Sequence, residues 1–227
     1  METKPDIDFS SVLASSVHDM KNSLCLLIQS IDRLSEQAQE QETSSELAKL
    51  HYEASRLNTN LLQLLSLYRA EKSSLPVNIE EHHILDIVEE IMTKNQLYLE
   101  NNQINVDLDI DESLSWYIDI DLISNLLNDI FINAMRYTDS RIKISAKVLE
   151  NQLMICIEDN GPGYSQHMLE QTSMTMQDLN LTNGRTGLGL FFAKLIAKAH
   201  QNEDQSGKIE LKNGGELGGS QFILTLP

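Results

Sequence analysis

Glycine is absent from the first 160 residues of this chain, and proline is scarce there. All ten glycines stand at position 161 or later, and Pro5 and Pro76 are the only prolines before Pro162. Because glycine and proline interrupt regular structure most strongly, the sequence predicts a long helix-permissive part followed by a part rich in loops. The length of 227 residues and the hydrophobic fraction of 41% fit one or two globular domains with real cores.

Other absences exclude whole classes of protein. No stretch approaches the ~18 consecutive apolar residues of a membrane helix, and the N-terminus lacks the basic-then-apolar pattern of a signal peptide. Cys25 and Cys156 are too few and too distant for a metal cluster or a disulfide framework, which indicates a reducing cytoplasm. The net charge of −17 argues against nucleic-acid and membrane partners. We therefore expect a cytoplasmic protein that holds any anionic ligand by local geometry or through a cation.

Apolar residues recur at heptad spacing in two series in the N-terminal part. Alternating steps of three and four residues are typical of a coiled-coil or bundle seam. The series are Leu13, Val17, Met20, Leu24, Leu27, Ile31, Leu34 and Leu47, Leu50, Ala54, Leu57, Leu61, Leu64, Tyr68. Polar residues 37–45 between them predict a loop, so the two helices form an antiparallel hairpin. Because one hairpin cannot bury so wide an apolar face, we predict a homodimeric four-helix bundle. The alternative is a hairpin that packs on its own second domain.

One histidine within the first predicted helix has polar neighbours. Asp19 follows His18 directly, and Lys21 and Asn22 lie on the same helical face as His18. A neutral imidazole is a competent nucleophile, and a neighbouring carboxylate can keep one of its ring nitrogens protonated. A solvated surface histidine has the same surroundings, so the pattern alone leaves both interpretations open.

The second part alternates between helical and strand patterns. Helical spacing covers residues 81–99, 121–137 and 188–200, and strand patterns cover 104–108, 141–149, 152–158, 208–213 and 220–226. Helices grouped with mostly antiparallel strands predict an α/β sandwich. Residues 73–76 read as a linker, so we place one domain in residues 1–75 and a second in residues 76–227.

Three polar residues interrupt the apolar helix at 121–137. Asn125, Asp129 and Asn133 follow one another at i, i+4 and i+8 along one face, although Asn and Asp are poor helix formers. Such oxygen donors suit Mg²⁺, which takes one or two protein oxygens together with substrate phosphates. Arg136 and Tyr137, toward the same end, offer a phosphate contact and a stacking ring. A polar stripe that merely faces solvent is the alternative.

Two glycine motifs belong to the same part of the chain. Residues 159–163 (DNGPG) end a strand, and their glycines let the backbone turn sharply and approach a ligand. The Asp159 carboxylate there can accept a hydrogen bond from a base amino group, although an ordinary turn has the same sequence. Residues 184–190 (GRTGLGL) lead into a helix, where free N–H groups and the helix dipole favour a phosphate.

Taken in order, these motifs resemble the transmitter region of sensor histidine kinases. The matching residues are His18-Asp19-Met20-Lys21-Asn22, Asn125…Asn133-Ala134, Asp159-Asn160-Gly161-Pro162-Gly163, Gly187-Leu188-Gly189-Leu190 and Gly219-Ser220-Gln221-Phe222…Leu226-Pro227. The resemblance implies a dimerisation and histidine phosphotransfer domain in about residues 7–72. It also implies a catalytic ATP-binding domain with the Bergerat fold of gyrase-type ATPases in about residues 76–227.

The resemblance implies a role for each matching residue. His18 would accept the phosphoryl group, Asp19 would be its general base, and Asn22 would position water for a phosphatase reaction. Asn133 and Asp129 would hold Mg²⁺. The implied nucleotide-binding residues are Asn125, Asp129, Asn133, Arg136, Tyr137, Asp159, Gly161, Gly163, Arg185, Thr186, Gly187, Leu188 and Gly189, with residues 164–186 as a lid.

The implied activity is autophosphorylation of His18 from Mg-ATP, followed by transfer to an aspartate of a response regulator, with a separate sensor as partner. Four features depart from the family pattern: Ser23 replaces a usual proline, Asp129 replaces the first Asn of a pair, the lid lacks a Phe-containing motif, and no sensor segment precedes the hairpin. A phosphotransfer scaffold with a degenerate ATP-binding domain therefore remains an alternative. A plain ATPase or a serine kinase of the same superfamily is a third possibility.

Overall fold

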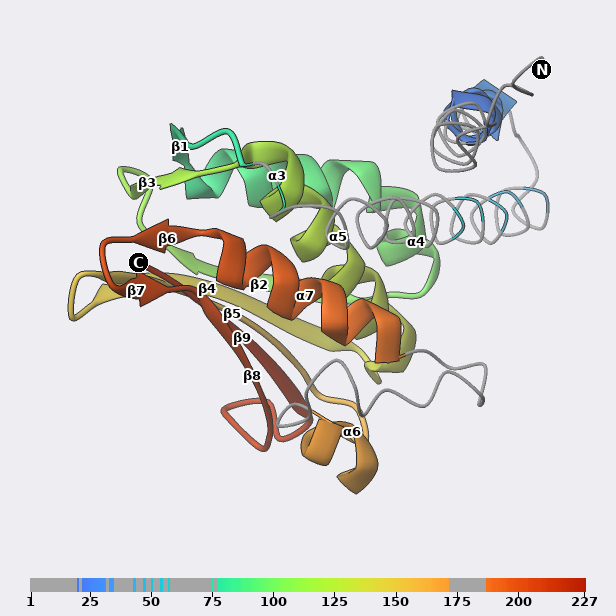
Figure 1. The fold of residues 1–227 in the computed structure, drawn as a ribbon. Coiled ribbons are helices and arrows are strands. Elements are labelled where there is room, and N and C mark those ends of the chain that lie inside the picture. Colours follow the sequence, from blue (N-terminus) through green and yellow to red (C-terminus); the bar gives the residue numbers. More distant parts are fainter. Residues whose placement is uncertain are drawn as a thin grey trace, which may run out of the picture. The chain divides into compact units, whose positions relative to one another are not determined.

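The computed structural model describes residues 20, 22–31, 33–34, 75, 77–171 and 187–227, together with positions 43, 47, 50, 54 and 57. The chain divides into two compact units, Met1–Lys72 and Ser73–Pro227. Figure 1 shows both units as a ribbon, and each is described by itself below.

The first unit is helical where it is described. Residues 22–31 form a helix, and the seam residues Ile31 and Ala54 are buried. Five other seam residues are about half exposed in the single chain: Met20, Leu27, Leu34, Leu50 and Leu57. Most of the expected hairpin, with His18 and Asp19, lies outside the described residues, so the hairpin stays a prediction. Within the predicted loop at 37–45 only position 43 is described, and it is helical.

A five-stranded mixed sheet organises the second unit, in the order β2-β4-β5-β9-β8. Its strands are β2 (Asn105–Ile110), β4 (Arg141–Leu149), β5 (Gln152–Asp159), β8 (Lys208–Asn213) and β9 (Ser220–Leu226). β2 runs parallel to β4, and the other three pairs are antiparallel. Two small two-stranded sheets join β1 (Glu80–His83) to β3 (Ser115–Ile118), and β6 (Gln201–Asn202) to β7 (Gln205–Ser206).

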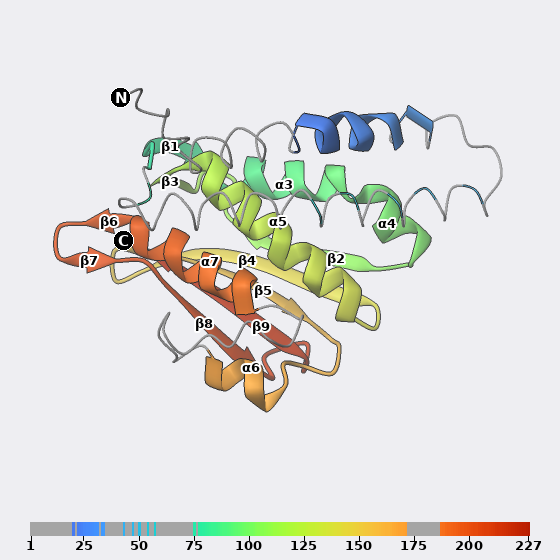
Figure 2. The same ribbon diagram turned by 45° about the vertical axis from the view of Figure 1, so that its right-hand side comes forward.

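Helices cover one face of this sheet. They are α3 (Ile84–Lys94), α4 (Gln96–Asn101), α5 (Ile120–Tyr137) and α7 (Gly187–Ala199), while α6 (Gln166–Gln171) follows the loop after β5. Figures 1 and 2 show α3, α5 and α7 on the same side of the strands, as the predicted α/β sandwich requires. Alternate strand residues such as Ile144, Ile155 and Leu224 are buried, as are Leu127 and Phe131 of α5. Burial of each such side chain stabilises the fold by roughly 1.5–3 kcal/mol.

The segment at 81–99 differs from the single helix that its spacing predicts. Its first residues form β1, because residues 80–83 pair in antiparallel register with residues 115–118. The helix then breaks at Asn95, which is buried and donates from its side-chain Nδ2 to the Ile91 carbonyl and to Asn128 Oδ1. A side chain that satisfies backbone groups in this way ends one helix before the next begins.

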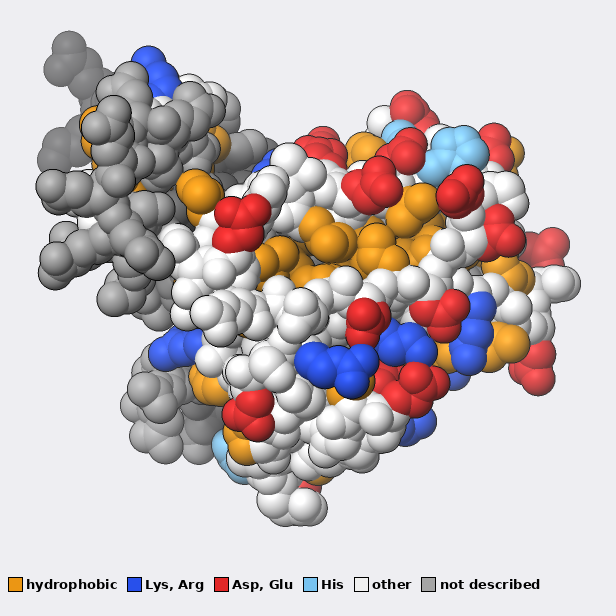
Figure 3. Space-filling view, turned by 180° about the vertical axis from the view of Figure 1, so that it is seen from behind, with side chains coloured by type: hydrophobic (Ala, Val, Ile, Leu, Met, Phe, Trp, Pro, Cys, Tyr) orange, Lys and Arg blue, Asp and Glu red, His pale blue; other side chains and the backbone are white. Residues whose placement is uncertain are grey.

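The side of the second unit away from α5 and α7 carries a hydrophobic stripe. Figure 3 shows it bordered by acidic side chains above and by alternating acidic and basic side chains below. Among the residues that the structure describes, no helix has the length and hydropathy needed to cross a bilayer.

Candidate functional site

The polar residues of α5 lie away from its buried face. The helix is capped by Asp119, whose carboxylate accepts from the Leu122 N–H at 3.0 Å, and its apolar residues pack on the sheet. Asn125 and Asn133 are exposed, and Asp129 between them is partly buried. The Asn125 side-chain NH₂ donates to the Asp121 carbonyl at 2.6 Å. The predicted polar series therefore forms one stripe along α5, outside the apolar core.

Arg136 and Tyr137 lie together at the C-terminal end of α5. The Arg136 guanidinium stands 5.4 Å from the centroid of the Tyr137 ring, and the ring is 53% exposed. A cation held over an aromatic face in this way is stabilised by the ring quadrupole. The pair presents a positive group and a flat apolar surface at the end of the polar stripe.

Asp159 ends the central strand β5 and is only 2% exposed. Its Oδ1 accepts from the N–H groups of Gly161 at 2.8 Å and Ser220 at 3.2 Å, and its Oδ2 accepts from the Ser220 hydroxyl. A buried carboxylate is tolerable only when donors surround it. Because two carboxylate oxygens offer about four acceptor positions, three bonds leave room for one further donor.

The loop after Asp159 is held against the end of α5 by Asn160. The Asn160 Oδ1 accepts from the Thr138 hydroxyl at 2.7 Å and from the Ser140 and Arg141 N–H groups at 3.0 and 2.9 Å. The approach is so close that a Cβ on Gly161 would lie 2.0 Å from the Tyr137 carbonyl oxygen. The structure thus brings the backbone of Gly161 next to Tyr137, while the nucleotide-binding role expected of these residues stays a prediction.

Asn213 fixes the other side of the same loop. Its Oδ1 accepts from the Tyr164 N–H at 2.7 Å, and its Nδ2 donates to the Tyr164 carbonyl at 2.9 Å. Gly163, with φ of +79°, passes so near that a Cβ there would lie 2.8 Å from Asn213 Oδ1. Burial raises the pKa of the Tyr164 phenol to about 12, so this hydroxyl stays protonated at neutral pH.

Sequence reasoning assigned no site role to Asn213 or Asn160, and it assigned none to Ser220 beyond the family motif. Each bonds through its side chain to residues 19 to 61 positions away, and such long-range bonds leave no periodic pattern in the sequence. A polar residue at a strand end beside glycines was the available signal.

The remaining predicted residues are described only in part. α7 begins at Gly187, so the glycine motif does open a helix, with Gly189 in its first turn. The position of Gly189 is partly exposed, and Phe192 and Ala193 behind it are buried. Arg185, Thr186, His18 and Asp19 lie outside the described residues, as does the side chain of Leu188. Asn22 is exposed on the helix of the first unit.

The Cys156 thiol of the second unit is held in its unreactive, protonated state. Burial and the nearby Glu158 carboxylate raise the pKa of the Cys156 thiol to about 12, which keeps it protonated. Within the described residues, no three His, Cys, Asp or Glu side chains gather as a metal cluster. Oxygen donors such as Asp129 and Asn133 still fit Mg²⁺, because this ion needs only one or two protein oxygens beside phosphate.

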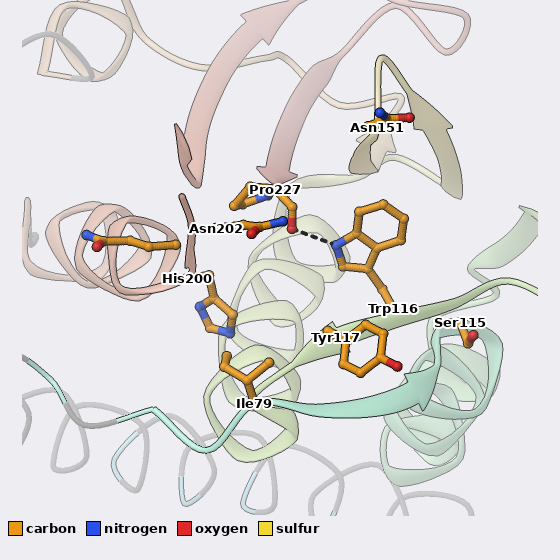
Figure 4. Close-up of a pocket in the computed structure, with 9 residues that line it drawn as sticks. Ile79, Ser115, Trp116, Tyr117, Asn151, His200, Asn202 and Pro227 are labelled. Atoms are coloured by element: carbon orange, nitrogen blue, oxygen red, sulfur yellow. Dashed lines mark hydrogen bonds between the residues drawn. The ribbon is translucent and has the colours of Figure 1, made fainter. Parts of the chain in front are cut away.

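A cavity of about 480 Å³ lies at the opposite end of the sheet from residues 159–163. Figure 4 shows Trp116, Tyr117 and His200 around it, with the Trp116 indole N–H donating to the Pro227 carbonyl at 3.0 Å. The His200 Nε2 accepts from the Asp119 N–H at 3.1 Å, and its Nδ1 donates to the Ile196 carbonyl at 2.8 Å. Both ring nitrogens are therefore occupied, and His200 is a structural histidine.

Comparisons with known proteins agree with this geometry. Residues 118–227 match the family model "Histidine kinase-, DNA gyrase B-, and HSP90-like ATPase". Sensor protein SrrB of Staphylococcus aureus strain N315 is 30% identical over 193 residues, which cover 82% of this chain and 32% of SrrB. The chain thus spans about a third of the length of the curated relatives it matches.

Solved structures share the fold at lower identity. The Acinetobacter baumannii histidine kinase AdeS superposes with a TM-score of 0.58 at 22% identity, covering 92% of this chain and 96% of that one. Full-length ShkA in complex with AMPPNP gives a TM-score of 0.63 at 18% identity, covering 96% of this chain and 45% of that one. The second unit is therefore an α/β domain like the ATP-binding domains of histidine kinases, and its residues 118–227 match the shared model of histidine kinase-, DNA gyrase B- and HSP90-like ATPases.

Proposed function

We propose that this chain is a histidine autokinase that binds Mg-ATP in its second unit and phosphorylates His18. The observation that carries the proposal is the buried Asp159 carboxylate. It is held by three donors, retains one free acceptor position and stands beside the glycine loop at the end of α5. An adenine amino group is a donor of the kind that would fill this remaining acceptor position.

The phosphates are expected between α5 and the start of α7. Free N–H groups at the Gly187 end of α7 and the Arg136 guanidinium favour negative charge. Magnesium, when bound, would neutralise the developing charge on the phosphates, with Asn133 and Asp129 as its protein oxygens. The unit itself is acidic, so these local groups have to overcome its overall field.

In the reaction that we propose, a ring nitrogen of His18 attacks the γ-phosphorus of ATP. A P–N bond forms, the bond to the β,γ-bridging oxygen breaks, and ADP leaves. Asp19 holds the other ring nitrogen and takes up its proton. Because transfer to a nitrogen needs mostly positioning and charge neutralisation, a histidine held on a helix serves this chemistry. The phosphoryl group would then pass to an aspartate of a response regulator. Asn22 would position water for the phosphatase reaction.

A homodimer is part of the proposal. Five heptad residues of the first unit are about half exposed in the single chain, although heptad positions of this kind pack between helices. A second copy of the hairpin would cover them in a four-helix bundle. A separate sensor protein and a cytoplasmic location remain expectations.

Labelled ATP tests the kinase. The full chain should acquire acid-labile, base-stable label from [γ-³²P]ATP, and His18→Gln should abolish it. His51→Gln, which changes a histidine without such polar neighbours, is the matched control and should retain the label. Label that persists in His18→Gln, or that survives acid, would contradict the proposal.

Asp129 favours one second candidate, a phosphotransfer scaffold whose nucleotide domain does not catalyse. An acid replaces the family's Asn at this position, and it is partly buried on the polar stripe. Gyrase-type relatives use an acid here as a general base for water, so Asp129 would also favour hydrolysis. Asp129→Asn with unchanged ATP turnover, phosphorylation and metal dependence would remove both ideas, and nucleotide binding without any label would favour the scaffold.

A further inference from the structure

β2 is the edge strand of the large sheet. It pairs with β4 on one side, and among the described strands none pairs with its other side. The Asn105 N–H donates to the Ser140 carbonyl, so residues 105, 107 and 109 direct their backbone groups toward β4. Because these directions alternate along a strand, the N–H and C=O groups of Val106, Leu108 and Ile110 face outward.

A groove with a mixed apolar and polar lining runs beside this open edge. Val106, Ile104, Leu99 and Met92 form the apolar part of a cavity of about 410 Å³ between β2 and the helices α3 and α4, and its polar part consists of Gln96, Glu100, Gln103 and Asn105. Leu108 and Leu97 are 39% and 40% exposed on the same elements. Figure 3 shows a hydrophobic stripe on the face of the second unit that is seen from behind the view of Figure 1. Native edges are usually blunted by proline, a bulge or an inward charge; β2 is six regular residues without proline.

The surroundings of the groove are strongly acidic. Residues 84–112 contain one lysine and eight acids, a balance of 1 − 8 = −7 within the total of −17. The acids are Asp86, Glu89, Glu90, Glu100, Asp107, Asp109, Asp111 and Glu112. Asp107 and Asp109 project from the opposite face of β2, where they meet Arg141 at 2.8 Å and Lys143 at 3.6 Å.

We propose that this edge binds an extended segment of a partner protein in which apolar residues alternate with Lys or Arg. The segment would add a strand to β2 and bond to the outward backbone groups of Val106, Leu108 and Ile110. Its apolar side chains would enter the groove, and its basic side chains would lie beside Asp107 and Asp109. A second copy of this chain does not fit as the partner, because its residues 84–112 carry a net charge of −7 and would repel the same region of the first copy. The proposal is independent of the kinase activity.

A synthetic eight-residue peptide that alternates valine and lysine is a suitable probe for the full chain. Two derivatives carry N-methyl groups on all valine amides or on all lysine amides, and each blocks one edge of the added strand. Strand addition requires that one derivative binds as the parent does and that the other binds at least tenfold more weakly. The bound parent should also slow exchange of the Val106, Leu108 and Ile110 amides in NMR spectra.

Leu108→Asp separates this geometry from simple charge attraction. The variant adds a negative charge, so unspecific attraction of a basic peptide would increase, whereas loss of the apolar contact should weaken binding at least tenfold. Leu149→Asp, at the last residue of β4, where the leucine is 49% exposed against 39% for Leu108, is the matched control and should bind the peptide within about twofold of the unsubstituted chain. Equal binding of the two methylated peptides, unaltered binding to Leu108→Asp, or no binding of the parent at millimolar concentration would overturn the proposal.

Discussion

Each end of the second unit contains a polar side chain that is almost fully buried. The two side chains differ in whether any of their hydrogen-bonding capacity is left unused. Asp159, 2% exposed, accepts three hydrogen bonds and keeps one acceptor position beside a glycine loop. His200, 3% exposed, has one donor and one acceptor, and the backbone occupies both. Burial of a polar group is therefore common to a candidate binding residue and a structural one. Unused bonding capacity is the feature that distinguishes them.

The largest expected effect comes from Asp159→Asn. The substitution exchanges the buried carboxylate for an amide and turns one of its acceptor oxygens into a donor, which opposes both Ser220 and an adenine amino group. We expect ADP affinity, measured by calorimetry at millimolar Mg²⁺, to fall on the order of 30- to 100-fold, about 2–3 kcal/mol. Asp139→Asn, an exposed aspartate, is the control. Unchanged affinity of Asp159→Asn would remove this residue from the site.

Gly161→Ala should have the next largest effect. Its Cβ would lie 2.0 Å from the Tyr137 carbonyl, so the loop must move away from α5. We expect a loss of about 1–3 kcal/mol in stability to urea, together with weaker ADP binding. Gly214→Ala meets nothing within 4 Å and adds only the strain of its φ of +105°, so it should leave ADP binding intact. The comparison is broken if both variants bind ADP equally.

His200 should make stability depend on pH without affecting the nucleotide. Burial lowers the pKa of this imidazole from its ordinary value of 6.5, so the unfolded chain binds the proton at higher pH than the folded chain. Its contribution to stability is complete above pH 6.5 and is lost as pH falls toward the lowered folded value. His200→Gln should flatten the pH dependence of the urea midpoint in this window and cost about 1 kcal/mol. A parallel loss of ADP affinity at constant fold would contradict the structural assignment.

Asn213→Ala should have the smallest effect. It removes two neutral bonds to the Tyr164 backbone, at 2.7 and 2.9 Å, each worth about 1 kcal/mol or less at an exposed site. We expect a weaker affinity for ADP of about threefold with little change in the melting temperature. Asn213→Asp, which keeps the acceptor, should recover part of the affinity. A fall in stability without any change in affinity would assign Asn213 to the fold alone.

Local periodicity predicted most of the fold. The alternation of residues 141–149, the helical spacing of residues 121–137 and the glycine at the start of α7 correspond closely to β4, α5 and α7. The same reasoning missed β1, because residues 80–83 (EEHH) have no alternation and become a strand only through pairing with residues 115–118. It also missed the break at Asn95, which depends on Asn128 in another helix.

The sequence singled out the glycines of the candidate site and the Asp159 carboxylate, but not the side chains that hold them in place. Gly161 and Gly163 mark close approaches that other residues cannot make, and both are visible in the sequence. Asn160, Asn213 and Ser220 act through side-chain bonds between distant segments, so local periodicity does not mark them, and their place beside glycines at strand ends was the available signal. The roles assigned to His18, Asp19, Arg185 and Thr186 stay predictions, since these residues lie outside the described part of the chain.

The position of β9 has a consequence for synthesis on the ribosome. This strand pairs with the central β5 across about 70 residues, from Leu153↔Leu226 to Glu158↔Gln221, and it supplies the Ser220 hydroxyl. A nascent chain that has not yet released residues 220–226 leaves one side of β5, with Ile155 and Ile157, without its neighbour. Translation must therefore run almost to its end before the Asp159 carboxylate acquires its hydroxyl donor, and until then the sheet is incomplete.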